Sequence, residues 1–145
     1  SWQNLYFNDD LVGETGINAA LCGYYGCPVL LVTGDTAACR EATALLGESL
    51  TTVAVKHGLS RFSARQIPPV RARQMIENGA QTALHNLKAV KPYVPTVPTT
   101  ITIELSTVDN ANEFRGRYGV KIVEPLKVVS EGEDWMQAWN QIWNY

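Results

Sequence analysis

The sequence predicts an α/β fold, in which a parallel β-α-β unit continues a larger sheet and a small α+β unit follows a proline-rich linker. Two observations lead to this prediction. A strand-helix-strand pattern occupies residues 28–56, a length of about 30 residues, which is typical of parallel strands joined by a crossover helix. Residues 88–100, KAVKPYVPTVPTT, contain three prolines and predict an extended linker. We therefore expect two domains, residues 1–90 and residues 91–145.

The first elements are a strand and a helix. Residues 2–10 alternate loosely and end in Asn8-Asp9-Asp10, which predicts a strand that runs into a turn. Residues 15–25 then carry apolar side chains at positions 17, 20, 21 and 24, which fits one face of a helix. Gly26 is a typical residue at the carboxyl end of a helix.

The β-α-β unit begins with an apolar run. Residues 28–33 are apolar without alternation, which predicts a strand buried on both faces. Gly34-Asp35-Thr36 is expected to cap a helix over residues 37–46, and Gly47 is expected to end it. Residues 51–56 predict the second strand, because they are rich in β-branched side chains.

The second half of the chain contains one long helix and several short elements. Residues 61–67 show no clear period, and Pro68-Pro69 is expected to open a helix over residues 70–87, with a possible break at Gly79. The elements expected after the linker are an alternating strand at 101–105, a short helix at 111–117, a strand or hairpin at 121–129 and a final helix at 134–144.

The final helix has one aromatic face. Trp135, Trp139, Ile142 and Trp143 follow a helical spacing. Tryptophan is enriched both in cores and in subunit interfaces, so the pattern leaves two interpretations open. The face packs on the core of the same chain, or it forms a contact between subunits.

Composition excludes several classes of partner. The chain of 145 residues is 46% hydrophobic and 18% charged, and its formal net charge is -2, so we expect no nucleic acid and no membrane as partners. No apolar run is long enough to cross a membrane, and the first ten residues do not resemble a signal peptide. Cys22, Cys27 and Cys39 lack metal-site spacing, and free thiols predict a reducing, cytoplasmic location.

Glu14 is the first candidate for chemistry, because it stands between Gly13 and Gly16 at the start of the first predicted helix. One interpretation is a capping acid, which the helix dipole and free backbone N–H groups stabilise. The other is a metal ligand, because glycines let a ligand or backbone approach closely and a carboxylate binds divalent cations. The residues alone leave both interpretations open.

The remaining candidates are weaker. His57 and His85 lack the spacing of a zinc motif. Gly34-Asp35-Thr36 follows a predicted parallel strand, and Lys56 and Arg61 could face the same crevice or solvent. Ser1 could act as an N-terminal nucleophile with its own amine as base, although loss of an initiator methionine explains it more simply.

Several motifs together resemble a known family. Residues 6–56 carry ND-x-x-VGE-x-G-x-NA, G-Y-Y-x-x-PV-L-x-V-x-GD and T-x-AVK in that order, followed by SR…A…PP. In order and spacing these motifs resemble the carboxyl-terminal half of the zinc-dependent D-aminopeptidases of the DppA type. The resemblance is strong to about residue 87 and looser beyond it.

The resemblance implies a metalloenzyme that removes N-terminal D-amino acids from short peptides with two neighbouring zinc ions. It implies that Glu14 is a zinc ligand, and it makes Asn18 of the same motif a candidate for contact with the substrate or for supporting that ligand. Residues 1–90 would be the second half of the catalytic domain, and residues 91–145 would serve oligomerisation. Homo-oligomeric rings are the assembly expected from the family.

The family's other zinc ligands and its catalytic histidine have no match in this chain. The resemblance therefore implies that the N-terminal half of the same enzyme is a partner, with this chain supplying one zinc ligand. Two alternatives remain: a non-enzymatic assembly module, and a two-chain hydrolase with Ser1 as nucleophile.

Overall fold

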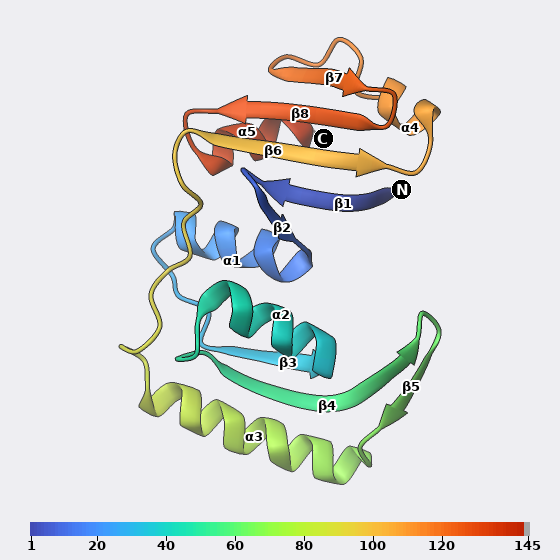
Figure 1. The fold of residues 1–145 in the computed structure, drawn as a ribbon. Helices are drawn as coiled ribbons and strands as arrows, with labels where there is room; N and C mark the ends of the chain where they lie inside the picture. Colours follow the sequence, from blue (N-terminus) through green and yellow to red (C-terminus); the bar gives the residue numbers. More distant parts are fainter. Residues whose placement is uncertain (144–145) are drawn as a thin grey trace. The chain divides into compact units, whose positions relative to one another are not determined.

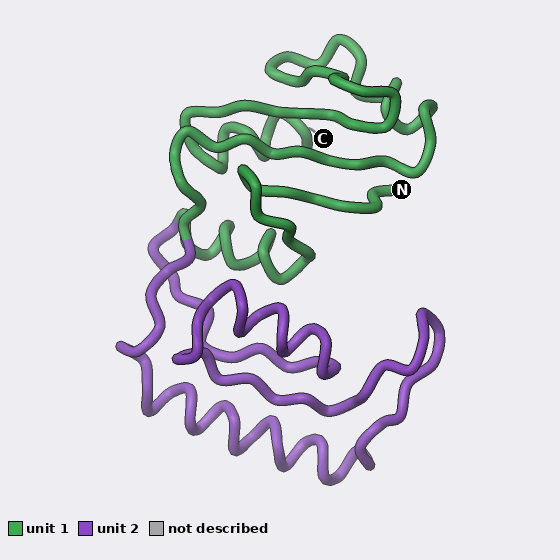
Figure 2. Tube along the Cα trace, viewed as in Figure 1, with its two compact units in different colours: residues 1–24, 94–145 green, residues 25–93 purple. Residues whose placement is uncertain are grey.

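The computed structural model describes residues 1–143 and divides into two compact units (Figures 1 and 2). Unit 1 is formed by residues 1–24 together with residues 94–145, and unit 2 by residues 25–93. The change at residue 93 falls inside the predicted linker. The two units nevertheless divide the chain differently from the expected domains of residues 1–90 and 91–145, because residues 1–24 join the carboxyl-terminal residues. The alternation of residues 2–10 indicates a strand without indicating its partner.

Unit 1 contains a five-stranded antiparallel sheet in the order β2-β1-β6-β8-β7. Three helices accompany it. The strands are β1 (Trp2–Phe7), β2 (Asp10–Val12), β6 (Thr99–Leu105), β7 (Val120–Glu124) and β8 (Lys127–Gly132), and the helices are α1 (Glu14–Tyr24), α4 (Val108–Asn112) and α5 (Trp135–Ile142). The predicted strands and final helix are thus present, whereas the short helix begins at Val108 instead of 111, because Thr107 caps it by accepting from the Asn110 N–H.

The core of unit 1 forms where β1 meets β6. Phe7 lies opposite Ile101 and Leu5 opposite Ile103, and all four side chains are buried. Helix α5 packs on β6 and β8, and the ring of Trp135 meets that of Phe7 edge to face at 5.7 Å between centroids. The alternation of β6 therefore turns its apolar side chains toward one helix.

The aromatic face of α5 packs in part on the core of its own chain, and a contact between subunits stays a prediction. Trp135 stacks on Trp139 at 5.3 Å and Trp139 on Trp143 at 5.5 Å between ring centroids. Trp2 of β1 meets both Trp139 and Trp143 edge to face. Trp135 is buried, whereas Trp143 is 46% exposed, so the aromatic row runs from the core to the surface. Residue 144, the predicted end of this helix, lies outside the described residues.

Unit 2 confirms the predicted β-α-β pattern. It contains β3 (Leu31–Asp35), α2 (Thr36–Leu46), β4 (Thr51–Ser60), β5 (Ser63–Gln66) and α3 (Pro69–His85). β3 and β4 are parallel, and β5 returns antiparallel to β4. Figure 1 shows α2 and α3 on opposite faces of this sheet. That the sheet continues into a larger one stays a prediction.

Two expectations for unit 2 are wrong. β3 is half-buried instead of buried on both faces, because it is an edge strand among the described residues and no further strand covers its outer side. β4 runs on to Ser60, and β5 forms within residues 61–67, where no period was found. Both strands are exposed beyond Val55, so burial imposes no alternation there.

Helix α3 passes through Gly79 without a break. A Cβ atom at Gly79 would lie 2.4 Å from Cγ2 of Val53 on β4. Gly79 is buried, and its missing side chain lets the helix approach the sheet closely. The glycine that weakens the helix locally therefore fixes how closely α3 packs.

The substitution Gly79→Ala tests this packing. Alanine favours a helix over glycine by about 1 kcal/mol, but overpacking against a stiff β-branched side chain costs about 1–3 kcal/mol. We expect a net loss of about 1 kcal/mol in the free energy of unfolding, measured by urea denaturation. Arg73→Ala, at an exposed position of the same helix, should change stability little; a Gly79→Ala variant more stable than the wild type would contradict the packing role.

Candidate functional site

Glu14 is the first residue of α1, directly after β2. The adjoining glycines have a structural explanation that the sequence did not supply. A Cβ atom at Gly16 would lie 2.6 Å from Cβ of Val12, and the Gly16 N–H donates to the carbonyl oxygen of Gly13. Gly16 therefore lets the first turn of α1 pack on the end of β2, and it does not by itself indicate room for a ligand.

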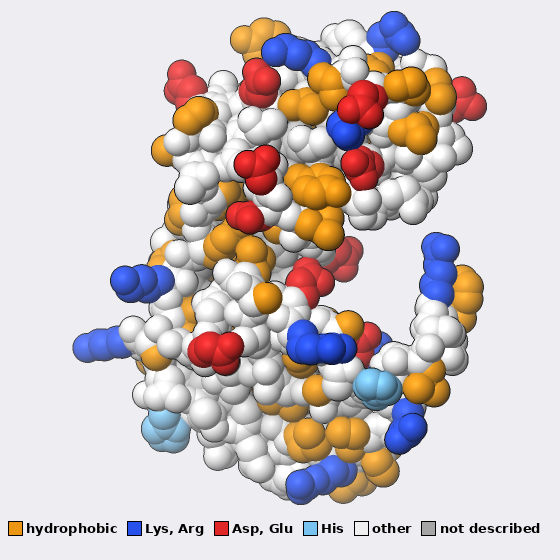
Figure 3. Space-filling model, in the orientation of Figure 1, with side chains coloured by type: hydrophobic (Ala, Val, Ile, Leu, Met, Phe, Trp, Pro, Cys, Tyr) orange, Lys and Arg blue, Asp and Glu red, His pale blue; other side chains and the backbone are white. Residues whose placement is uncertain are grey.

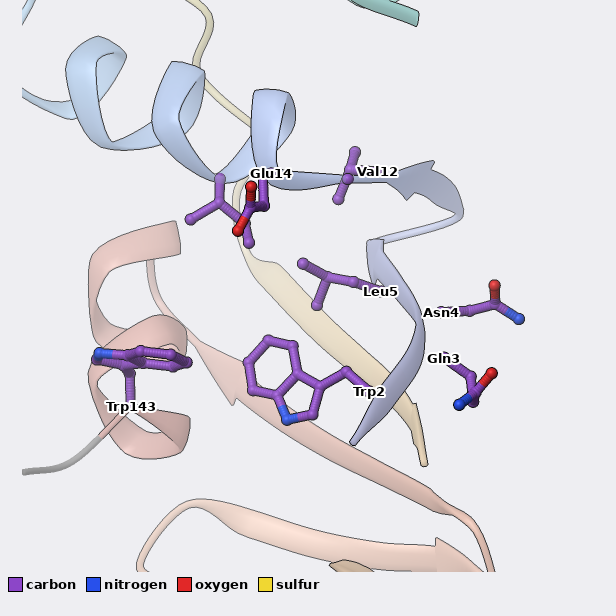
Figure 4. A pocket seen from close by; sticks show the side chains of 9 residues that line it. Trp2, Gln3, Asn4, Leu5, Val12, Glu14 and Trp143 are labelled. Carbon is purple, nitrogen blue, oxygen red and sulfur yellow. The ribbon is translucent and has the colours of Figure 1, made fainter. Parts of the chain in front are cut away.

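The Glu14 side chain is exposed and lies at the edge of a cavity of 490 Å³ within unit 1 (Figure 4). Most of the lining is apolar, and Glu14 is its one charged residue. The lining residues come from β1, from the β2–α1 junction and from the end of α5: Trp2, Gln3, Asn4, Leu5, Val12, Gly13, Glu14, Ile17 and Trp143. A single carboxylate thus borders an apolar surface.

Two tryptophans form one side of this cavity. The rings of Trp2 and Trp143 meet edge to face with 5.6 Å between their centroids. Figure 4 shows Trp2 reaching toward Trp143, whereas the side chains of Gln3 and Asn4 point away from it. The Asn4 Nδ2 donates to Oε2 of Glu104 at 2.7 Å, so its amide is held by the sheet. The cavity can therefore take an apolar group beside Glu14.

Asn18, the other predicted site residue, lies one turn after Glu14 on α1. Its Nδ2 donates to the backbone carbonyl oxygen of Glu14 at 2.9 Å, and its side chain is exposed. Asn18 does not line the cavity. The geometry fits a residue that braces the start of α1, and a contact with substrate stays a prediction.

The described residues do not assemble a complete metal centre. Residues 1–143 contain no group of three or more His, Cys, Asp or Glu side chains placed to hold a metal ion. A protein zinc site takes three or four protein ligands. That Glu14 serves as one ligand of a zinc site stays a prediction.

His57, His85, Cys27 and Cys39 belong to unit 2, whereas Glu14 belongs to unit 1. His57 Nδ1 lies 3.0 Å from Oγ1 of Thr36, and His85 Nδ1 lies 2.7 Å from the carbonyl oxygen of Gln81. His57 lies within β4, opposite Arg65. All three cysteines are free thiols, and burial raises the pKa of Cys39.

A second polar cluster forms in unit 2 at the carboxyl end of β3. Asp35 accepts from the N–H groups of Ala37 and Ala38, both at 2.8 Å, and so caps α2 as predicted. The Ala38 N–H is the main cause that holds the pKa of Asp35 below its usual range, with smaller contributions from Lys56 and His57. Arg61 does not join this cluster, because it lies at the turn between β4 and β5. The segment Gly34-Asp35-Thr36 thus caps α2, and the Lys56 and His57 side chains lie near the Asp35 carboxylate.

Comparison with known proteins shows the family of the chain. The family model described as D-aminopeptidase, peptidase family M55, matches residues 1–143. The chain belongs to this D-aminopeptidase family. The D-aminopeptidase of Bacillus subtilis strain 168 is 33% identical over 138 residues, which cover 94% of this chain and 50% of that protein.

The family also contains a solved structure with the same fold. It is the Zn-dependent D-aminopeptidase DppA from Bacillus subtilis, described as a self-compartmentalizing protease. The TM-score is 0.90 at 32% identity, over 97% of this chain and 52% of that chain. The chain thus spans about half the length of the relatives it matches. Among residues 1–143, no helix is long and apolar enough to cross a membrane.

Sequence reasoning found Glu14 but missed the cavity beside it. Trp143 belongs to a helical aromatic row that was recognised, yet nothing in the sequence indicated that Trp2, at the other end of the chain, would meet it. Only the pairing of β1 with β6 brings these rings together.

The substitution Asp35→Asn tests the capping carboxylate. The folded protein lowers the pKa of Asp35, so its charge contributes stability above the usual pKa of an aspartate, and this contribution is lost as pH falls through the folded pKa. We expect the variant to have a lower free energy of unfolding at pH 7 and the difference to vanish in acid. Urea denaturation from pH 7 downward measures it; Asp9→Asn, at an exposed turn, is the control, and a difference independent of pH would contradict the charge effect.

Proposed function

We propose that this chain is the second half of a zinc-dependent D-aminopeptidase that removes N-terminal D-amino acids from short peptides. The observation that carries the proposal is Glu14, which stands in the VGE-x-G motif at the edge of an apolar cavity. Membership of the D-aminopeptidase family and similarity to the Zn-dependent DppA support the reaction class.

Glu14 would hold one of two zinc ions. Its carboxylate is exposed at the start of α1, a position open to a cation. Bound zinc would lower the pKa of a water molecule and polarise the scissile carbonyl group. The N-terminal half of the same enzyme would supply the remaining ligands and the catalytic histidine.

The cavity beside Glu14 would cover an apolar part of the peptide substrate. Trp2, Leu5, Val12 and Ile17 offer apolar contacts within reach of the carboxylate. Asn18 would keep α1 in place through its bond to the Glu14 carbonyl oxygen. Selection for the D configuration depends on groups that border the substrate α-carbon, and these include residues of the other half.

We further propose that the chain assembles with copies of itself in the cytoplasm. The support is the description of the related DppA as a self-compartmentalizing protease.

Two other functions compete with this proposal. A non-enzymatic assembly module is favoured by the incomplete metal donor set of the described residues. A hydrolase with Ser1 as nucleophile is not favoured, because the Ser1 amine donates to Asn110 Oδ1 at 2.7 Å and to Ser106 Oγ at 3.0 Å instead of serving as a free base.

The substitution Glu14→Gln tests the zinc role in the chain combined with its N-terminal half. Glutamine keeps the size of the side chain but loses the charge that a zinc ligand needs. We expect zinc to fall from about two ions per site to about one, and the hydrolysis of D-alanyl dipeptides to fall more than about 100-fold. Zinc quantification and a peptidase assay on the same samples measure both.

Glu48→Gln, another exposed glutamate, is the matched control and should keep both zinc and activity. A capping acid predicts a different result for Glu14→Gln, namely a lower melting temperature with full zinc content and turnover. That result would refute the ligand role.

A further inference from the structure

The β4–β5 hairpin of unit 2 extends away from its own sheet. We define the hairpin arm as residues 56–66. The pairing of β3 with β4 ends at Lys56, and beyond it β4 pairs with β5 only, in the register His57 to Arg65 and Gly58 to Ala64. Every residue of the arm is exposed. Figure 1 shows the two strands projecting past the helices of unit 2.

The tip of the hairpin arm presents an aromatic ring together with a cation. Arg61 and Phe62 form the turn between Ser60 and Ser63, whose Oγ atoms lie 2.8 Å apart. Phe62 is 91% exposed, and the Arg61 guanidinium carbon lies 5.4 Å from the centroid of its ring. Leu59 is exposed nearby, and Figure 3 shows hydrophobic and basic side chains over the arm.

Turn geometry does not require these two residue types. Neither Arg61 nor Phe62 has a positive φ, and a turn without positive φ accepts most residues. Aromatic residues such as phenylalanine, and arginine, are enriched in protein interfaces relative to the rest of the surface.

The hairpin arm carries Lys56, Arg61 and Arg65 and no acidic residue. The absence of Asp and Glu extends over residues 49–76, which also contain Arg71 and Arg73. Unit 1 has the opposite character, because its acidic residues far outnumber its four basic ones. The acidic residues of unit 1 are Asp9, Asp10, Glu14, Glu104, Asp109, Glu113, Glu124, Glu131, Glu133 and Asp134. Two copies of this chain therefore carry complementary surfaces.

The β1–β2 turn of unit 1 matches the tip most closely in chemistry. Asp9 and Asp10 are exposed there, and Leu11 beside them is an exposed apolar residue. Arg61 and Arg65 could pair with the two carboxylates while Phe62 and Leu59 contact Leu11. The turn thus offers both kinds of contact that the arm requires.

We propose that the hairpin arm of one copy docks on the β1–β2 turn of a second copy. Phe62 is the apolar anchor, and Arg61 and Arg65 face Asp9 and Asp10. The contact joins two different surfaces, so repeated contacts of this type close into a ring when the rotation between subunits permits it. The inference rests on the proposed self-assembly of the chain and names the surfaces that mediate it.

Two arm variants test the proposal: Phe62→Ser, and Arg61→Glu combined with Arg65→Glu. All three positions are exposed, and circular dichroism checks that the fold is kept. We expect the wild-type chain to form oligomers in native mass spectrometry and light scattering, and each variant to raise the dissociation constant at least about tenfold. Tyr118→Ser is the matched control, because Tyr118 is 90% exposed on unit 1 and should leave assembly unchanged.

A charge exchange identifies the acceptor. Adding Asp9→Lys and Asp10→Lys to the Arg61→Glu, Arg65→Glu variant should restore assembly, and its failure to do so overturns the β1–β2 turn as the docking site.

A wild-type chain that stays monomeric at all concentrations, or a Phe62→Ser variant that assembles as the wild type does, overturns the role of the arm. The finding that the hairpin arm binds only the N-terminal half of the enzyme, and not a second copy of this chain, would also overturn the role of the arm. The Glu14→Gln variant should assemble as the wild type does. Loss of zinc therefore tests the proposed function, and loss of assembly tests the hairpin arm.

Discussion

The pairing of β1 with β6 is the constraint on which the rest of unit 1 depends. It joins the first residues of the chain to residues that follow the proline-rich segment, so that unit 2 is an insertion between two parts of one sheet. Phe7, Ile101 and Ile103 are almost completely buried at this pairing, and Trp135 of α5 covers them. Burial of these side chains offsets the entropy lost in bringing residues nearly one hundred positions apart together.

The pairing of β1 with β6 also determines where the residues of the candidate site lie. β1 carries Trp2 to the end of α5, where it meets Trp143, and the turn into β2 leads directly to Glu14 at the start of α1. Gly16 fixes the position of α1 by allowing contact with Val12. The carboxylate and the apolar cavity therefore owe their proximity to backbone pairing and close packing, and not to a local motif alone.

The sequence allowed the order of elements to be predicted but not all their partners. Capping residues and helical periodicity were sufficient to predict α2, which Asp35 caps, and α5, which carries the aromatic row. Long-range pairing has no local pattern, so the grouping of residues 1–24 with 94–145 was missed. β5 was missed because a fully exposed hairpin needs no alternation. Glu14 was identified from its motif, whereas Trp2 gave no local indication that it lines the cavity.

Intact and native mass spectrometry of the purified protein, with zinc quantified on the same sample, tests the central claim most directly. The account predicts that this chain of 16.0 kDa occurs with a polypeptide that supplies the remaining zinc ligands and the catalytic histidine, and that the pair holds about two zinc ions. A chain that remains without such a partner segment and binds no zinc would contradict it. In that case the D-aminopeptidase fold would be present without the enzyme's chemistry.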